Sequence, residues 1–97
     1  MIYIFIQHDV EDFARWKETF DTHLSARQAG GATEQIFAMR NVDDLNEITV
    51  LLGWLDLERA RLFVQSVSLN ESMQKSGVVD QAEILLLEEL PNCFDKH

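Results

Sequence analysis

Three side chains in this sequence could do acid–base or anion-binding chemistry in an apolar setting: His8, His23 and Arg27. His23 and Arg27 are four residues apart, so in a helix they face the same way. At about 100° per residue they share that face with the aromatic residues Trp16 and Phe20. The segment therefore points a titratable imidazole and a permanent cation toward an apolar core.

His8 follows the apolar run at 2–6 and has the same alternation as Ile2, Ile4 and Ile6. An imidazole titrates near neutral pH, so at a pocket rim His8 could act as a general acid, a general base or a ligand donor. The alternative is structural, with His8 bonding the acidic start of the next helix and shaping the turn. The sequence leaves both interpretations open.

His23 and Arg27 also allow two interpretations. As a clamp, Arg27 would offer its fork of donors to an anion or a polar substrate. As a structural pair, Arg27 would bond a strand carboxylate or the last carbonyls of its own helix, while its stem covers apolar surface. In both cases the guanidinium needs a partner, because an unpaired buried charge costs several kcal/mol.

The two histidines are expected to lie far apart. A helix that returns antiparallel to the first strand carries His23 roughly 18 Å from the helix start, at 1.5 Å per residue, while His8 stays at the opposite end. A two-histidine metal site within one subunit is therefore not expected, and no further ligand occurs at a spacing typical of metal sites.

Aromatic and sulfur-containing side chains could line a pocket for a flat apolar molecule. The predicted binding residues are Trp16, Phe20, Arg27, Met39 and Trp54, and the predicted catalytic residues are His8 and His23. The alternative is plain core packing, which the helical and strand spacing of these residues also allows. Trp54 differs from the others because its indole N–H needs a hydrogen-bond partner.

Alternating apolar runs and turn residues predict four strands, over 2–6, 33–41, 47–55 and 81–90. The short polar turn "VDDLN" joins the second and third of them into an antiparallel hairpin.

Two helical regions lie between these strands. The first is predicted over 10–29, capped by Asp9 or Asp12 and ended by the pair Gly30–Gly31. The second begins after Asp56 and is predicted to break near Ser68, where Ser68 and Glu71 would form a capping box, before it resumes toward residue 76.

The order β-α-β-β-α-β predicts a ferredoxin-like α+β fold, a four-stranded antiparallel sheet with two helices on one face. Residues 1–90 would form the single domain and 91–97 a C-terminal tail. The strands carry apolar residues at both alternations, whereas a sheet wet on one side alternates apolar with polar. The second face therefore needs a cover, and we expect a second copy of the chain to provide it.

The net charge, the cysteine count and the short N-terminal apolar run exclude several classes of partner and location. The 97 residues carry a net charge of −9, with 17 acidic against 8 basic residues, so neither nucleic acid nor an anionic membrane is an expected partner. Cys93 is the only cysteine, so no internal disulfide is possible and a reducing cytoplasm fits best. The apolar run at the N-terminus is too short for a signal peptide or a membrane span.

Most of the chain carries a resemblance. "HDVEDFARWKETFDTH", the glycine pair after it, "NVDDLNEITVLLGWLDLERARLF" and "MQKSGVV" with "LLLEEL" resemble small bacterial proteins of the dimeric α/β-barrel superfamily, which includes antibiotic biosynthesis monooxygenase-like proteins. The resemblance covers residues 1–90. It implies a homodimer in which two sheets pack face to face, with a pocket between the sheet and the helices of each subunit.

The functions implied by the resemblance are diverse, because the superfamily includes cofactor-free oxygenases, polyketide cyclases, lactone isomerases and haem-degrading enzymes. The sequence lacks the residues of the haem-degrading branch, since the first strand has no asparagine and the second helix no histidine. We expect a small-molecule-binding homodimer without a cofactor, a monooxygenase or a cyclase/isomerase for an aromatic or polyketide-like compound. The alternative is a non-enzymatic structural or regulatory dimer with no open pocket.

Overall fold

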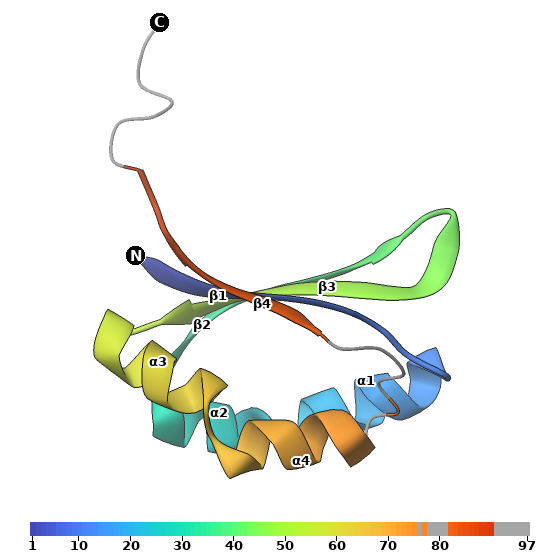
Figure 1. Ribbon diagram of the computed structural model, residues 1–97, viewed down its shortest axis with the longest axis horizontal. Coiled ribbons are helices and arrows are strands. Elements are labelled where there is room, and N and C mark those ends of the chain that lie inside the picture. The colour runs from blue at the N-terminus through green and yellow to red at the C-terminus, as the bar shows by residue number, and fades with distance from the viewer. Residues whose placement is uncertain (76, 78–81, 91–97) are drawn as a thin grey trace, which may run out of the picture.

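The chain folds into one antiparallel sheet with helices along one of its faces (Figure 1). The computed structural model describes residues 1–75, 77 and 82–90. In chain order the elements are β1 (Ile2–Asp9), α1 (Phe13–Thr22), α2 (Leu24–Gly30), β2 (Ala32–Asn41), β3 (Asp44–Trp54), α3 (Leu57–Val64), α4 (Val67–Lys75) and β4 (Glu83–Glu88).

The sheet has the strand order β2-β3-β1-β4, and every neighbouring pair is antiparallel. At its centre, Ile4 of β1 pairs with Leu52 of β3 on one side and with Leu86 of β4 on the other. Strand β2, the first strand of the β2–β3 hairpin, forms one edge, and β4 forms the other. The predicted ferredoxin-like fold class is confirmed.

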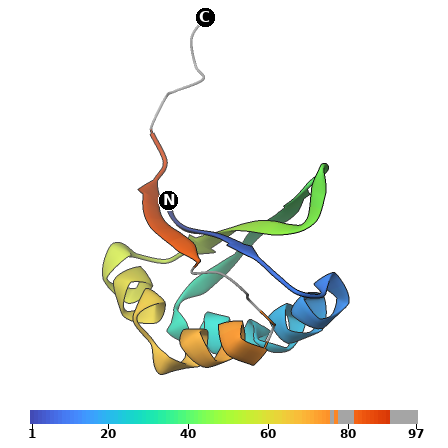
Figure 2. The same cartoon turned by 45° about the vertical axis from the view of Figure 1, so that its right-hand side comes forward.

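The two faces of the sheet have different surroundings. Two views show the helices on the same side of the sheet (Figures 1 and 2). The inner face, turned to the helices, contributes most of the buried core, namely Ile4, Ile6, Ile48, Val50, Leu52 and Trp54. On the outer face, the apolar side chains of Phe37, Met39, Leu85 and Leu87 are 39–54% exposed. The single chain therefore leaves a broad apolar surface uncovered.

The first helical region differs from its prediction. A single helix was expected over 10–29, but the helix begins at Phe13, after the N-cap Asp12, and breaks at His23 into α1 and α2. Polar groups compete for the last carbonyls of α1. The Thr22 hydroxyl donates to the Thr19 carbonyl at 3.1 Å, and the Arg27 guanidinium donates to the Phe20 carbonyl at 2.8 Å. Such competition bends and ends helices.

The second helical region also breaks, but not at the predicted residue. Helix α3 ends at Val64 and α4 begins at Val67, because the Ser66 hydroxyl accepts a hydrogen bond from the Leu69 amide at 3.1 Å. This is the N-cap geometry that was assigned to Ser68. Ser68 lies within the first turn of α4 instead, so the predicted capping box with Glu71 is wrong.

The strands differ from their predicted bounds in ways that affect the site. Strand β1 continues to Asp9, and the Val10 amide donates to the Asn46 carbonyl at 2.9 Å instead of entering a helix. His8 therefore lies inside the strand, not at its end. Strand β4 covers Glu83–Glu88 within the predicted 81–90, while residue 81 and the tail 91–97 with Cys93 lie outside the described residues.

Trp54 joins the sheet to the end of α2. Its side chain is fully buried, and its indole Nε1–H donates to the Gly30 carbonyl at 2.8 Å. The next residue, Gly31, has φ of 115°, a left-handed conformation that ends α2 at its C-cap. The indole therefore has the partner that its burial requires.

Replacement of Gly31 by alanine should destabilise the protein more than the same change at Gly77. Both glycines have positive φ, which costs an alanine about 1–2 kcal/mol. At Gly31 the added Cβ would also lie 2.9 Å from Trp54 Nε1, whereas at Gly77 it would lie 3.5 Å from Nη1 of the Arg15 side chain. We expect Gly31→Ala to lower the free energy of unfolding by about 3 kcal/mol, because strain and a lost hydrogen bond add. Urea denaturation of both variants measures this, and equal losses would contradict it.

Candidate functional site

A small cavity lies between the inner face of the sheet and the helices. Its volume is about 40 Å³, room for roughly two or three water molecules. Sheet residues form one wall and α1 and α2 the opposite one, with α3 and α4 closing the remainder. The lining residues are Ile6, His8, Trp16, Phe20, His23, Arg27, Val50, Leu52, Phe63, Leu69 and Met73.

His8 enters this cavity from the central strand β1. The alternation of β1 turns it to the same face as Ile4 and Ile6, and its side chain is only 7% exposed. Neither Nδ1 nor Nε2 has a hydrogen-bond partner among the described residues. The structural interpretation, a bond from His8 to the start of the helix, is therefore not what the structure shows.

Burial determines the charge of His8. Desolvation penalises the imidazolium form and lowers the pKa of His8 below its ordinary value. The ring is therefore neutral at pH 7, with an unshared lone pair on one nitrogen. Trp16 lies beside it, with ring centroids 6.1 Å apart. A neutral imidazole in an apolar cavity can act as a base. Its free lone pair accepts no hydrogen bond from any described residue.

An aromatic wall continues from Trp16 along α1. The rings of Trp16 and Phe20 are stacked, with centroids 4.9 Å apart and planes 17° apart. Their spacing of four residues on one helix brings them together. This pair separates His8 at one end of the cavity from Arg27 at the other. We call it the Trp16–Phe20 wall.

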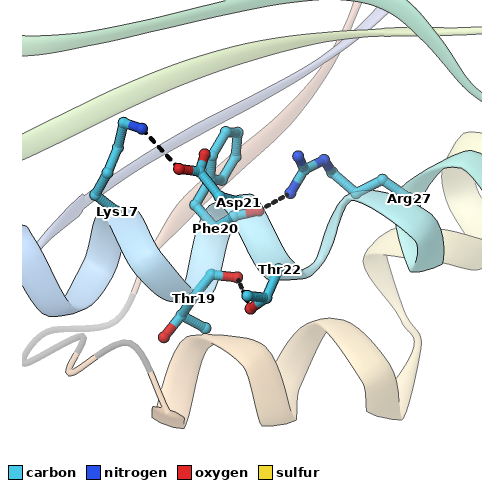
Figure 3. A network of polar contacts seen from close by, with 6 residues as sticks. All are labelled: Lys17, Thr19, Phe20, Asp21, Thr22 and Arg27. Atoms are coloured by element: carbon cyan, nitrogen blue, oxygen red, sulfur yellow. Dashed lines mark hydrogen bonds and ion pairs between the residues drawn. The ribbon is translucent and has the colours of Figure 1, made fainter.

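Arg27 is a buried cation, with a residue exposure of 3%. Its Nη1 donates to the Phe20 carbonyl at 2.8 Å, and its guanidinium carbon lies 3.9 Å from the centroid of the Phe20 ring (Figure 3). Burial lowers the pKa of Arg27, and the charge of Asp21 acts in the opposite direction. One of the structural partners considered from the sequence, a late helix carbonyl, is thus present.

His23 occupies the break between α1 and α2. Its ring centroid lies 6.1 Å from that of Phe63, and the side chain is partly buried. Desolvation is the largest effect that lowers the pKa of His23, and the positive charge of Arg27 adds to it. Arg27 therefore imposes a positive potential on this end of the cavity.

The structure brings five of the seven predicted site residues to one cavity: His8, Trp16, Phe20, His23 and Arg27. Both histidines line this cavity, so the expectation that they share no site is corrected. They enter it from different neighbours, His8 beside Trp16 and His23 beside Phe63. The break at His23 ends the first helix at Thr22, and α2 follows α1 along the same face of the sheet (Figure 2).

Met39 and Trp54 do not line the cavity. Met39 pairs with Thr49 in the sheet and belongs to the outer face, where it is 54% exposed. Trp54 lies in the core, against Phe63 and Gly30. Met39 lies between Ala38 and Arg40, which face inward, so its side chain points to the opposite face of the sheet. The alternation along the second strand would therefore have excluded Met39 from the predicted pocket.

Among the lining residues that the sequence analysis did not assign to the site are Leu69 and Met73 on α4. Their spacing of four residues was a usable signal, since it puts both on one helical face. The sequence analysis placed the start of this helical segment at Ser68 instead of Ser66, and this face was therefore not recognised.

Among the residues that the structure describes, no three histidine, cysteine, aspartate or glutamate side chains are grouped to hold a metal ion. In the same part of the chain, none of the helices has the length and apolar character needed to cross a membrane.

Comparison with known proteins identifies the fold through structure, not sequence. No protein-family model matches the sequence, and no curated protein matches it. Among solved structures, a protein from Bordetella bronchiseptica described as an antibiotic biosynthesis monooxygenase aligns over 92% of this chain and 96% of its own, with 12% identity and a TM-score of 0.76.

Two further structures agree. A protein of the same description from Caulobacter crescentus covers 92% of this chain and 89% of its own, with 12% identity and a TM-score of 0.71. SnoaB from Streptomyces nogalater, a cofactor-independent oxygenase, covers 93% of this chain and 96% of its own, with 17% identity and a TM-score of 0.67. The chain thus has the fold of antibiotic biosynthesis monooxygenase-like proteins, as the resemblance implied.

Stability should fall below pH 6.5 partly through His8. The pKa of His8 is lowered in the folded state, so above 6.5 both states are neutral and the full stability is present. As the pH falls below 6.5, the unfolded chain binds a proton that the folded chain resists. One such group changes the free energy of unfolding by at most about 1.4 kcal/mol per pH unit. His8→Leu should flatten this dependence between pH 6.5 and 5.

Urea denaturation of the wild type and His8→Leu at several pH values tests this expectation. The difference between the two proteins should be constant above pH 7 and should shift in favour of His8→Leu below 6.5. Carboxylates titrate in both proteins and cancel in the comparison. Parallel curves down to pH 5 would show that His8 takes up protons equally in both states.

Proposed function

We propose that the protein is a cofactor-independent enzyme that removes a proton from a carbon next to a carbonyl group in a small aromatic or polyketide-like compound. In this proposal it is a homodimer in the cytoplasm. The observation that carries this proposal is His8: a buried, neutral imidazole with both nitrogens unpartnered, facing a cavity with an aromatic wall. The single cysteine favours the cytoplasm. The likeness to SnoaB supports oxygen chemistry as one outcome of the proton transfer.

The chemical step begins with His8 as the base. Its unprotonated nitrogen takes a proton from a carbon next to a carbonyl group, which leaves a carbanion and an imidazolium. In the isomerase or cyclase outcome, the imidazolium returns the proton or the carbanion attacks a second carbonyl carbon. In the oxygenase outcome, the carbanion reduces and combines with O₂, and the peroxide takes the proton back. Loss of water then gives a ketone.

A neutral base in an apolar cavity suits this chemistry. Polar solvent would stabilise the imidazolium before reaction, whereas the low polarity around His8 keeps the free lone pair available. The stacked Trp16–Phe20 wall offers a flat surface to an aromatic substrate.

The outer face of the sheet supports the proposed dimer. Phe5 pairs with Leu51 on one side and Leu85 on the other, so the apolar surface is continuous across three strands. Phe37 extends it onto β2, also opposite Leu51. Exposed contiguous apolar patches of this kind mark interaction surfaces. A second copy offers the same surface in a two-fold arrangement, which closes the assembly.

Loss of the His8 imidazole should abolish proton abstraction. We expect the wild type to accelerate exchange of the benzylic protons of phenylacetone, an uncharged carbon acid, with D₂O. His8→Leu should reduce this acceleration by a factor of about 100 or more, as removal of a general base does. Proton NMR of the substrate measures the rate, and thermal unfolding of the variant confirms that it is folded.

His23→Gln provides the comparison. His23 lies beside Arg27, whose charge disfavours its protonation, so we expect this variant to lose less than about tenfold. If His23→Gln abolishes exchange and His8→Leu does not, His8 is not the base. If the wild type accelerates exchange of neither phenylacetone nor larger aromatic ketones, proton abstraction is not the function.

The small cavity favours a second candidate, a dimer with a structural or regulatory role and no catalysis. A volume of about 40 Å³ is well below the roughly 300–1,000 Å³ of pockets that hold drug-sized ligands. In that case the site would not bind phenylacetone, and His8→Leu would raise stability without any other effect. The exchange measurement therefore separates the two candidates.

A charge on the outer face should separate the proposed dimer. Leu85 is 44% exposed in one subunit, and Leu85→Glu would bury two carboxylates per dimer. We expect its dissociation constant to rise about 100-fold or more, which corresponds to the loss of about 3 kcal/mol. Sedimentation across a concentration series measures this.

Leu62→Glu is the matched control, because Leu62 is exposed on α3, away from the outer face. It should leave the assembly state unchanged. A wild type that sediments as a monomer at micromolar concentration would contradict the dimer.

A further inference from the structure

We propose that the Arg27 end of the cavity is a carboxylate-binding subsite, so that the ligand is an organic acid. Its carboxylate would lie on the Arg27 guanidinium and its body along the Trp16–Phe20 wall. This inference rests on the proposed function, since it names the class of ligand for the same cavity.

The charge of Arg27 lacks direct compensation. Within the described part of the chain, its guanidinium donates one hydrogen bond, to the Phe20 carbonyl, a neutral acceptor. Nε is buried and has no hydrogen-bond partner among the described residues. A carbonyl satisfies one donor but does not neutralise a charge, so the desolvation cost of a 3%-exposed cation is only partly offset.

Among the described residues, no carboxylate forms an ion pair with Arg27. The protein has 17 acidic residues, and two of them form ion pairs on the surface, Lys17–Asp21 and Arg59–Asp56. Asp21 acts on Arg27 through its field, but its carboxylate is bound by Lys17 at 2.7 Å (Figure 3). An acidic protein that leaves a buried arginine without a direct ion pair has a place for an external anion.

The orientation of the guanidinium fits a carboxylate. In an arginine, Nε–H lies on the edge that binds a carboxylate side-on, whereas the bond to Phe20 uses Nη1. The Phe20 ring, 3.9 Å from the guanidinium carbon, fixes the plane of the fork. The two contacts with Phe20 therefore hold Arg27 in place and leave its Nε–H without a partner. This arrangement preorganises the guanidinium for a ligand.

The remaining contacts set the shape of the ligand. Phe20 stacks on Trp16, and Trp16 lies beside His8, so an apolar surface connects the cation to the base. A carboxylate on Arg27 would direct a planar body along this surface, with its far end toward His8. The ligand class that fits is an aromatic or acyl carboxylate that carries an acidic C–H.

Room for such a body lies next to Trp16. This side chain lines the 40 Å³ cavity and also a hollow of about 250 Å³ between α1 and β2, which Phe13 and Met39 border as well. On this proposal, a movement of the Trp16 side chain connects the two spaces. Their combined volume of about 290 Å³ is close to the lower limit of roughly 300 Å³ for ligand pockets.

The test compares phenylpyruvate with its uncharged amide. Both are titrated into the full-length wild type, with tryptophan fluorescence for affinity and the ¹⁵N resonance of Arg27 Nε for position. We expect phenylpyruvate to bind at least tenfold more tightly than the amide and to shift the Nε resonance. Acetate, which fits the cavity without movement of Trp16, should shift the same resonance, whereas acetamide should not.

Variants then locate the charge. Arg27→Met should remove the preference for phenylpyruvate. It should not lower the unfolding temperature, since it deletes an uncompensated buried charge. Arg27→Lys, which keeps a positive charge, should retain part of the preference. Arg61→Met, at an exposed position on α3, is the control for net charge and should bind as the wild type does.

Several outcomes would overturn the subsite. These are equal affinity for acid and amide, unchanged binding of phenylpyruvate to Arg27→Met, or an Nε resonance that neither phenylpyruvate nor acetate shifts. Binding of phenylpyruvate without proton exchange of any carbon acid contradicts the proposed catalysis alone. Exchange of phenylacetone without preference for the acid contradicts the subsite alone.

Discussion

The constraint on which this structure depends is that the helices cover one face of an apolar sheet. The inner face contributes Ile4, Val50 and Trp54 to the core, and their burial is the main source of stability in a domain of this size. The helices must follow that face, and α1 and α2 do so by breaking at His23. The break brings His23 and Arg27 to the same cavity as His8. Packing therefore decides where the polar groups meet.

The polar groups of the cavity are a cost within this core. His8 has two nitrogens without partners, and Arg27 has one partnered donor and an unpartnered Nε among the described residues. Each lost hydrogen bond of a buried group costs about 1–3 kcal/mol, a substantial part of the stability of a small domain. Leucine or methionine at these positions would satisfy the core better. Retention of an imidazole and a guanidinium there favours a role in binding or chemistry over one in folding.

The sequence predicted the fold because the alternation of strands and the helical stripes are local signals. It also predicted that His8 and Arg27 face inward, since parity and helical phase determine this. It did not predict the break at His23, because the competing bond from Arg27 to the Phe20 carbonyl is formed only in the packed structure. Extrapolation along one straight helix therefore did not reveal that both histidines line one cavity. Met39 was misplaced by the alternation of the second strand, which the pairing of Met39 with Thr49 fixes.

Strand β1 is hydrogen-bonded on both edges and presents opposite sides to two different environments. His8 faces the cavity, while its neighbour Gln7 faces the other way and donates to Thr49 at 3.3 Å. A molecule bound to the outer face would therefore contact the same strand that carries His8. By thermodynamic linkage, any free energy that couples binding at the outer face to occupancy of the cavity acts equally in both directions. In the proposed dimer, the central strand alone could thus transmit cooperativity between the two cavities.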